Sequence, residues 1–389
     1  MNTLPAGDPA PETDRTGAPG LDERTARVAR LTRAAGASFA VLSGYDAVFD
    51  ATGLRVPQEL GVPFVSGGPD LALVAPDGET WLVVPRMRAG AAHASRADHV
   101  IEYGDDTLGL EPLAPRYLSG VRAALAALPA RGDVLIQPDS LTLPVAEALR
   151  ERGHDLRDIT DPLRRARMVK TPAEWAALQR CADLTSAAQR VARQAARAGR
   201  TELEVFADIR AVWDRAVGHR SEVTGDFMTG IERTAAIVGW ATDRVLREGD
   251  PVIADLAPRL DGYWGDSAST FVLGEPDPRL RAMHAAVRGA LDAGLAAVRP
   301  GITAAALDAV VREAMPGFSY PHHTGHSVGA ASHEFPTISP GVEVPLEEGM
   351  VILLEPGAYD PEVGGVRLEW MIRVGADGAE IMSDFPLDL

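Results

Sequence analysis

The chain has 389 residues, of which 46% are hydrophobic, and its formal net charge is −17. This length is enough for two or three domains with sizeable cores, and the negative charge argues against nucleic acid or an anionic membrane surface as a partner. The single cysteine, Cys181, excludes an intramolecular disulfide and fits a reducing cytoplasm, and no apolar run approaches the roughly 18 residues that span a bilayer.

The N-terminal part of the chain predicts a tail followed by an α/β domain. Residues 1–20 are rich in Pro, Gly, Ala and Asp and lack the basic-then-apolar pattern of a signal peptide, so we expect a disordered tail. Over residues 21–160, amphipathic helical stretches alternate with short apolar strands. The expected helices are Leu21–Ala35, Arg116–Leu128 and Leu143–Arg152, and the expected strands include residues 39–42 and 80–84.

A second domain is predicted over residues 161–389, where long helices alternate with strands. Thr171 and Glu174 have the spacing of a capping box and Pro172 stands at the first helical position, so a helix is expected from there to about Ala198. Helices on one side of an antiparallel sheet give an α+β class. Later helices are expected from Thr201 onward, over Arg279–Val298 and over Ala304–Met315.

Two acids lie in a predicted β-hairpin of this second domain. Asp255 lies in an apolar strand-like run over residues 251–258, and Asp266 lies in the returning run over residues 263–273, after an Asp261-Gly262 turn signal. If Leu260-Asp261 is the centre of the turn, the two acids are directly opposite; if Asp261-Gly262 is, they are diagonal neighbours on one face. In either register two buried carboxylates face each other, and a divalent cation between them is the economical way to offset their repulsion.

Two further acids and a histidine extend this pattern. Glu355 ends an apolar strand-like run, and Arg367 and Glu369 share one face of a predicted strand over residues 365–372. His326 is framed by glycines, so a metal or a bulky ligand can approach its imidazole. Because buried charges must be paired or bound to metal, the sequence predicts a divalent metal site.

The order of these residues resembles the five metal ligands of the creatinase/aminopeptidase family, whose catalytic domain has the pita-bread fold. The resemblance covers the hairpin, the Thr-Gly-His-Ser-Val-Gly and His-Glu-Phe-Pro motifs, and the two glutamate strands. It implies two divalent ions, with a bridging water between them, chosen among manganese, cobalt, iron and zinc. The implied ligands are Asp255 on one ion, His326 and Glu355 on the other, and Asp266 and Glu369 bridging both.

The same resemblance implies further roles for residues and for the whole chain. His322 and His333 match non-ligand histidines that contact the substrate in the Xaa-Pro subgroup, and Arg367 matches the arginine beside the last ligand. Residues 21–160 resemble the creatinase-like N-terminal domain of two-domain relatives. Such relatives commonly form homodimers, so we expect a homodimer.

Two departures from the family pattern bear on the substrate. Val238 stands where the peptidases have a further substrate-contacting histidine, and its side chain cannot transfer a proton. After Asp266 the chain continues Ser267-Ala268-Ser269, which replaces a hydroxyl and an arginine of the family pattern. The sequence therefore favours a metal-dependent hydrolase of a small amide, a dipeptide-like compound or a specialised metabolite.

Other functions remain open at this point. The chain can be a genuine Xaa-Pro aminopeptidase or dipeptidase, a non-hydrolytic lyase, or a catalytically silent binding module on the same fold. A serine hydrolase is a further alternative, because residues 325–329 fit Gly-x-Ser-x-Gly. The only later histidine is His333, too close to Ser327 for the order of an α/β-hydrolase triad.

Overall fold

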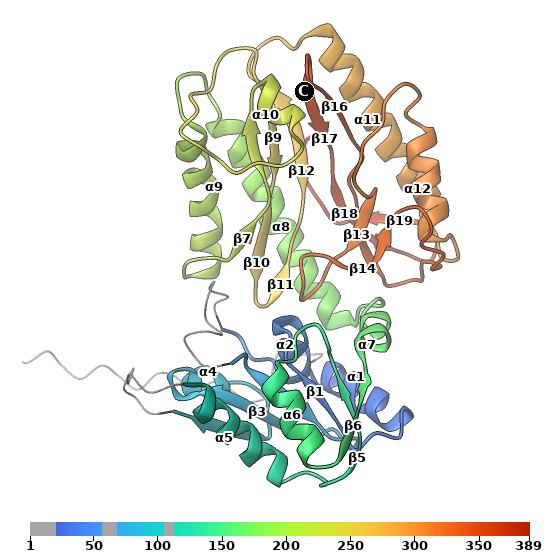
Figure 1. Cartoon of the computed structure of the whole chain (residues 1–389). Helices are drawn as coiled ribbons and strands as arrows, with labels where there is room; N and C mark the ends of the chain where they lie inside the picture. Colours follow the sequence, from blue (N-terminus) through green and yellow to red (C-terminus); the bar gives the residue numbers. More distant parts are fainter. Residues whose placement is uncertain (1–20, 57–67, 105–112) are drawn as a thin grey trace, which may run out of the picture. The chain divides into compact units, whose positions relative to one another are not determined.

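The computed structural model of the protein is drawn in Figure 1. It describes residues 21–56, 68–104 and 113–389. The expected disordered tail lies outside these residues. Contacts divide the chain into two compact units, Met1–Ile159 and Thr160–Leu389. We propose that these two units are the two domains expected from the sequence.

The N-terminal unit is the predicted α/β structure, a six-stranded mixed sheet with helices packed against it. Its strand order is β4-β3-β2-β1-β5-β6, in which β1 is parallel to β5 and antiparallel to β2. The strands are β1 Phe39–Leu42, β2 Leu71–Val74, β3 Thr80–Pro85, β4 His99–Tyr103, β5 Gly132–Ile136 and β6 His154–Asp158. The helices are α1 Leu21–Ala34, α2 Tyr45–Thr52, α4 Ala89–His93, α5 Leu113–Ala126 and α6 Leu143–Glu151.

The C-terminal unit begins with helices whose starts follow the predicted signals. Thr171 accepts from the backbone N–H of Glu174 at 3.2 Å, while the Glu174 carboxylate accepts from the N–H of Thr171 at 2.9 Å, which confirms the capping box. The helices of this unit are α7 Thr160–Ala166, α8 Pro172–Ala195, α9 Glu202–Val217, α10 Ile231–Ala235, α11 Pro278–Ala297 and α12 Ala304–Glu313.

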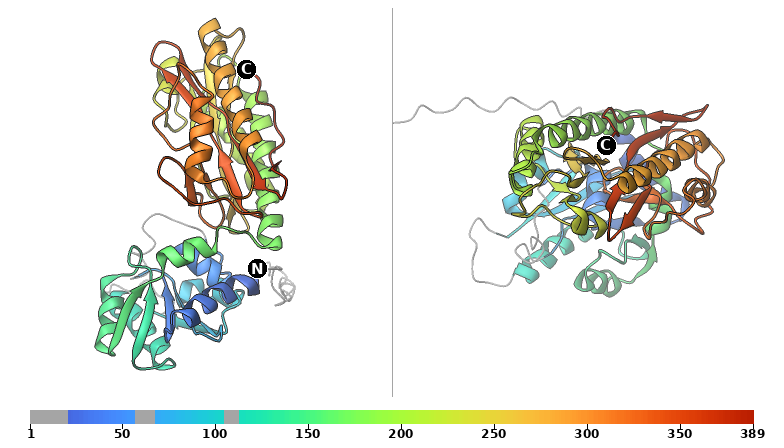
Figure 2. Two further views of the ribbon diagram at one scale, coloured as in Figure 1. Left: turned by 90° about the vertical axis from the view of Figure 1, so that its right-hand side faces the viewer. Right: turned by 90° about the horizontal axis from the view of Figure 1, so that it is seen from above.

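Antiparallel strands fill the rest of this unit in two groups, each with its own helix pair. Helices α8 and α9 lie beside the first group and α11 and α12 beside the second, as Figures 1 and 2 show. The first group is β7 Val223–Thr224, β8 Phe227–Thr229, β9 Pro251–Asp255, β10 Ala257–Leu260, β11 Tyr263–Trp264 and β12 Ala268–Val272. The second is β13 Gly325–Ser327, β14 Glu334–Ile338, β15 Val351–Leu354, β16 Gly357–Asp360, β17 Gly364–Arg367, β18 Trp370–Val374 and β19 Ala379–Ile381.

One predicted strand is wrong. The alternation over residues 365–372 suggested a continuous strand, but the chain forms β17, which pairs with β16, and then β18, which pairs with β15. Glu369 lies at the crossing, where its N–H donates to the carbonyl of Ala268 at 2.8 Å. The change of partner strand brings Glu369 to the strand that follows Asp266.

Among the described residues, no helix is both long and apolar enough to cross a membrane.

Candidate metal centre

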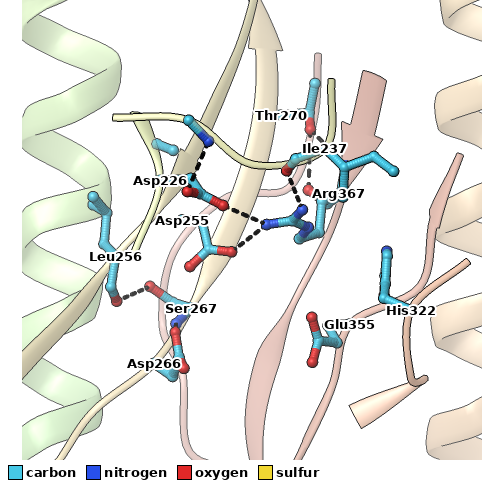
Figure 3. Close-up of polar contacts among 12 residues, drawn as sticks. Asp226, Ile237, Asp255, Leu256, Asp266, Ser267, Thr270, His322, Glu355 and Arg367 are labelled. Atoms are coloured by element: carbon cyan, nitrogen blue, oxygen red, sulfur yellow. Dashed lines mark hydrogen bonds and ion pairs between the residues drawn. The ribbon is translucent and has the colours of Figure 1, made fainter. Parts of the chain in front are cut away.

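The two aspartates of the hairpin adopt the second of the two expected registers. Asp255 pairs with Ala268 across β9 and β12, which makes Asp266 its diagonal neighbour. The backbone holds this arrangement, because Leu256 N–H donates to the carbonyl of Ser267 at 2.8 Å and Ser267 N–H donates to Oδ1 of Asp266 at 2.9 Å. Figure 3 shows both carboxylates near this end of the hairpin.

His326 is held on β13 with one ring nitrogen left for a ligand. Its Nδ1 lies 2.9 Å from the carbonyl of Ser327, an acceptor that requires the proton on Nδ1 and leaves the lone pair on Nε2. Nε2 lies 3.8 Å from Oδ2 of Asp266 and 3.7 Å from Oε1 of Glu355. Burial lowers the pKa of His326 to about 4, so the imidazole is neutral, the form that binds metal.

A glycine allows this strand to come close to its neighbour. A Cβ at Gly325 would lie 1.9 Å from the carbonyl oxygen of Leu353 on β15, so only glycine fits there. The approach brings His326 beside Glu355, which follows β15. Asp266, His326 and Glu369 offer ligand atoms that all lie within 4.8 Å of one another.

The charges at this centre are only partly compensated from within the chain. Burial, reinforced by the charges of Asp255 and Glu355, raises the pKa of Asp266 well above its usual value. Burial and the charge of Asp266 raise the pKa of Glu369 in the same way. Burial alone would also raise the pKa of Glu355, but His323 and His326 beside it lower it to about 2. A set of four carboxylates and a neutral imidazole with this surplus of negative charge fits divalent cations.

Arg367 occupies the Asp255 side of the centre. Its Nη1 lies 2.5 Å from Oδ2 of Asp255 and 3.3 Å from Oδ2 of Asp226, and its Nη2 donates to the carbonyl of Ile237 at 2.5 Å (Figure 3). Even so, burial raises the pKa of Asp255 to about 6 against the attraction of Arg367. Arg367, which the sequence matched to the arginine beside the last ligand, thus lies against Asp255, an expected metal ligand.

Two residues of this network were missed in the sequence. Tyr359 accepts from Nε of Arg367 at 3.0 Å, and its hydroxyl lies 2.9 Å from Nε2 of His322. Asp226 accepts from the N–H of Gly239 at 2.9 Å in addition to its contact with Arg367. Tyr359 stands four residues after Glu355, and the family resemblance gave it no role. Asp226 has no signal in the sequence, since only the fold brings it near Arg367.

The hydrogen bonds that join His323, His322 and Tyr359 are consistent with one placement of the protons. His322 Nδ1 lies 2.8 Å from the carbonyl of His323, which places the proton on Nδ1 and leaves Nε2 to accept from the hydroxyl of Tyr359. Burial raises the pKa of Tyr359 to about 12, so the phenol keeps its proton. Both nitrogens of His322 are engaged, and a substrate contact requires one of these bonds to open.

The segment that carries His333 is fixed by a buried ion cluster. The His333 ring stacks on His326, with centroids 3.9 Å apart and planes 19° apart. The next residue, Glu334, pairs with Arg167 and with Nζ of Lys170, the latter at 2.8 Å, and accepts from the N–H of Ala331 at 3.2 Å. The exposed His333 is thereby held beside the candidate metal ligands.

Comparison with known proteins identifies the family. The sequence profile of metallopeptidase family M24 matches residues 176–376. The chain belongs to this family. As an M24 protein it is a metal-dependent hydrolase, and the family generally uses divalent metal ions. This confirms the family, the enzyme class and the pita-bread fold predicted from the sequence.

Relatives of this M24 protein include dipeptidases. It is 31% identical over 318 residues to the putative dipeptidase YkvY of Bacillus subtilis (strain 168), covering 80% of this chain and 85% of the relative. It is 30% identical over 247 residues to the Xaa-Pro dipeptidase of Pyrococcus furiosus, covering 62% and 71%. The crystal structure of dipeptidase PepE from Mycobacterium ulcerans superimposes with a TM-score of 0.77 at 30% identity, covering 97% of this chain and 99% of that one.

The segment around Val238 has an unusual backbone. Val238 N–H donates to the carbonyl of Ala236 at 2.9 Å around Ile237, whose φ is 75°, which is the geometry of a classic γ-turn. A β-branched residue at positive φ is strained. The carbonyl of this same Ile237 accepts from Arg367, so the turn is fastened to the metal centre. Val238 itself is 67% exposed.

Ser327 in this M24 protein is not arranged as a nucleophile. It is fully buried, and its hydroxyl donates to the carbonyl of Val351 at 2.9 Å. A serine nucleophile needs a base as the acceptor of that proton. The Gly-x-Ser-x-Gly match therefore reflects the packing of β13 against β15.

Proposed function

We propose that this M24 protein hydrolyses a small amide or dipeptide-like substrate with two divalent ions, held by the five residues expected from the sequence. The observation that carries the proposal is the buried pair Asp266 and Glu369, whose pKa values are both raised by burial and, in addition, by the other acids that they face. Buried carboxylates of this kind need a cation. The five proposed ligands are Asp255, Asp266, His326, Glu355 and Glu369.

When bound, the two ions would activate a water molecule and polarise the bond under attack. The chain's own residues then have separate tasks. Arg367 orients Asp255 by its 2.5 Å contact, and the carbonyl of His323 fixes the tautomer of His322, whose Nε2 accepts from the hydroxyl of Tyr359. His333 is exposed beside His326 and is placed to donate to, or accept from, a bound substrate.

The first experiment tests the metal site itself. Elemental analysis after reconstitution should find about two divalent ions per chain, by the proposed five-ligand set. Manganese, cobalt, iron and zinc are each compared, since oxygen-rich ligation with one imidazole suits all four. Absence of metal from the wild type, with Asp266→Ala indistinguishable from it, would remove the proposal.

The second experiment concerns Val238 and the substrate. An exposed valine cannot exchange a proton with the scissile group, and loss of such a catalytic group costs about 10²–10⁴-fold. We therefore expect the wild type to cleave Xaa-Pro peptides slowly. Val238→His should raise the rate of cleavage by at least about tenfold, which is less than the full effect of such a catalytic group. An apolar replacement, Val238→Leu, is the matched control and should leave the rate low.

A second candidate function is supported by the relatives. Several have names of dipeptidases, and three of these carry the name Xaa-Pro dipeptidase. If the wild type cleaves Xaa-Pro peptides at about 10 s⁻¹, the usual enzyme median, a genuine Xaa-Pro aminopeptidase or dipeptidase replaces the first candidate.

We also propose a homodimer, which rests on the family resemblance and which light scattering of the purified protein would test.

A further inference from the structure

His323 lies at the metal centre without a role among the five proposed ligands. Its Nε2 is 2.8 Å from Oε1 of Glu355. Both atoms are buried, and apart from this ion-pair contact neither has a hydrogen-bond partner among the described residues. A buried imidazole nitrogen and a buried carboxylate oxygen this close together are unfavourable unless a proton or a cation lies between them.

The spacing of these atoms matches that of two ligands on one ion. Ligand atoms at bond lengths of about 2.1 Å and at right angles lie about 3 Å apart. The 2.8 Å separation of His323 Nε2 and Glu355 Oε1 is close to this value. Nitrogens of His323, His326 and His333 also lie within 4.8 Å of one another.

The ring planes decide which two of these three histidines can share an ion. A metal bound to an imidazole nitrogen lies near the plane of the ring, so the planes of two ligands must meet at the ion. The His323 and His326 rings are 86° apart with centroids 5.5 Å apart, and their planes cross nearby. The His326 and His333 rings are stacked at 19°, so their planes do not meet close to either ring.

We propose that His323 is an additional ligand of the ion held by His326 and Glu355, which gives the centre two imidazoles instead of one. This inference rests on the proposed two-metal function. A second imidazole makes this position less oxygen-rich, so it should favour zinc or cobalt over manganese more strongly than the five-residue set does.

X-ray absorption spectroscopy of the zinc-loaded and the cobalt-loaded full-length protein counts the imidazoles directly. The wild type should show two imidazoles for each pair of ions, and His323→Ala should show one. The matched control is His333→Ala, which removes an imidazole from the same cluster but should leave the count at two. Because the His323 side chain is 30% exposed, its loss should leave the fold intact, which circular dichroism checks.

Competition with a chelator gives the corresponding affinities. His323→Ala should weaken zinc binding at one site by at least about tenfold. Loss of a residue that only hydrogen-bonds to a metal ligand already costs about 10–100-fold in affinity. The loss for manganese should be smaller, while His333→Ala should leave both affinities unchanged. Two ions with one imidazole in the wild type, or unchanged zinc affinity in His323→Ala, overturns this inference alone. A wild type that binds no metal overturns the proposed function instead.

Discussion

Two carboxylate groups in the C-terminal unit are equally buried and yet have opposite properties. The side chains of Glu334 and Asp266 are each 7% exposed. Burial alone would raise the pKa of both, but Arg167 and Lys170 hold the pKa of Glu334 at about 2, whereas that of Asp266 is raised well above its usual value. The presence of partner cations, and not the degree of burial, separates the two.

This difference distinguishes a structural ion cluster from a binding site. The Glu334 cluster is neutralised from within, so it needs nothing further and fixes the segment that carries His333. Asp266 faces Asp255, Glu355 and Glu369, and its charge must be met by a species from outside the chain. Substitutions that remove one charge from each cluster should therefore act in opposite directions.

The largest expected effect comes from Asp266→Asn. Asparagine can keep the acceptor for Ser267 N–H while removing one charge from the centre. We expect loss of bound metal and a fall in turnover of more than about 10²-fold, the loss typical of removing a charge-stabilising group. The metal-free variant should be more stable to urea than the metal-free wild type, because a buried repulsion is gone. Lower stability of the variant would contradict our account of the uncompensated acids.

Glu334→Gln should have the opposite effect on stability. It leaves the buried Lys170 ammonium and the Arg167 guanidinium without their shared carboxylate, which costs about 3–5 kcal/mol when a buried ion pair is broken. Urea unfolding of the metal-free protein measures this. Glu348→Gln, at an exposed position, is the matched control and should change stability by less than about 0.5 kcal/mol. A loss as small as that of the control would show that the cluster contributes little.

The metal centre, through Asp255, and the ion cluster, through Glu334, should also give the stability of the protein opposite pH dependences. The pKa of Asp255 is raised from 3.8 to about 6, so the folded, metal-free protein binds its proton more tightly and loses stability as pH rises through this interval. The pKa of Glu334 is lowered from 4.5 to about 2, so its contribution is present above pH 4.5 and is lost as pH falls towards 2.

Urea titrations of the metal-free protein at several pH values test both signs. Asp255→Asn should flatten the decline in stability between pH 4 and 6, whereas the cost of Glu334→Gln should shrink below pH 4.5. If Asp255→Asn leaves the slope between pH 4 and 6 unchanged, the proton is bound elsewhere.

Local signals in the sequence predicted much of this fold and part of the site. The capping box at Thr171 formed as expected, and the hairpin register at Asp255 was one of two that turn chemistry allowed. These features depend on residues close in sequence, whose geometry is nearly independent of the rest of the chain. The family resemblance, with its ordered acids, supplied the expected ligand set.

The features that the sequence did not predict depend on contacts between distant residues. Lys170 and Glu334 are 164 residues apart, and nothing in either segment indicates that they pair. Asp226 reaches Arg367 across 141 residues. The break before Glu369 was also missed, because the alternation of apolar residues continues through it while the hydrogen-bonded partner strand changes.

The smallest expected effect distinguishes the metal centre from a serine nucleophile on the same segment. Ser327→Ala removes the hydrogen bond to Val351 and should cost about 1 kcal/mol of stability, since one buried carbonyl loses a donor. Metal content and turnover should stay at the wild-type level, because the hydroxyl points into the strand packing. His326→Ala, one residue away, is the matched comparison and should lose metal and activity together. An inactive Ser327→Ala variant that keeps its metal would support Ser327 as a nucleophile, because loss of a nucleophile abolishes activity while the metal ligands stay in place.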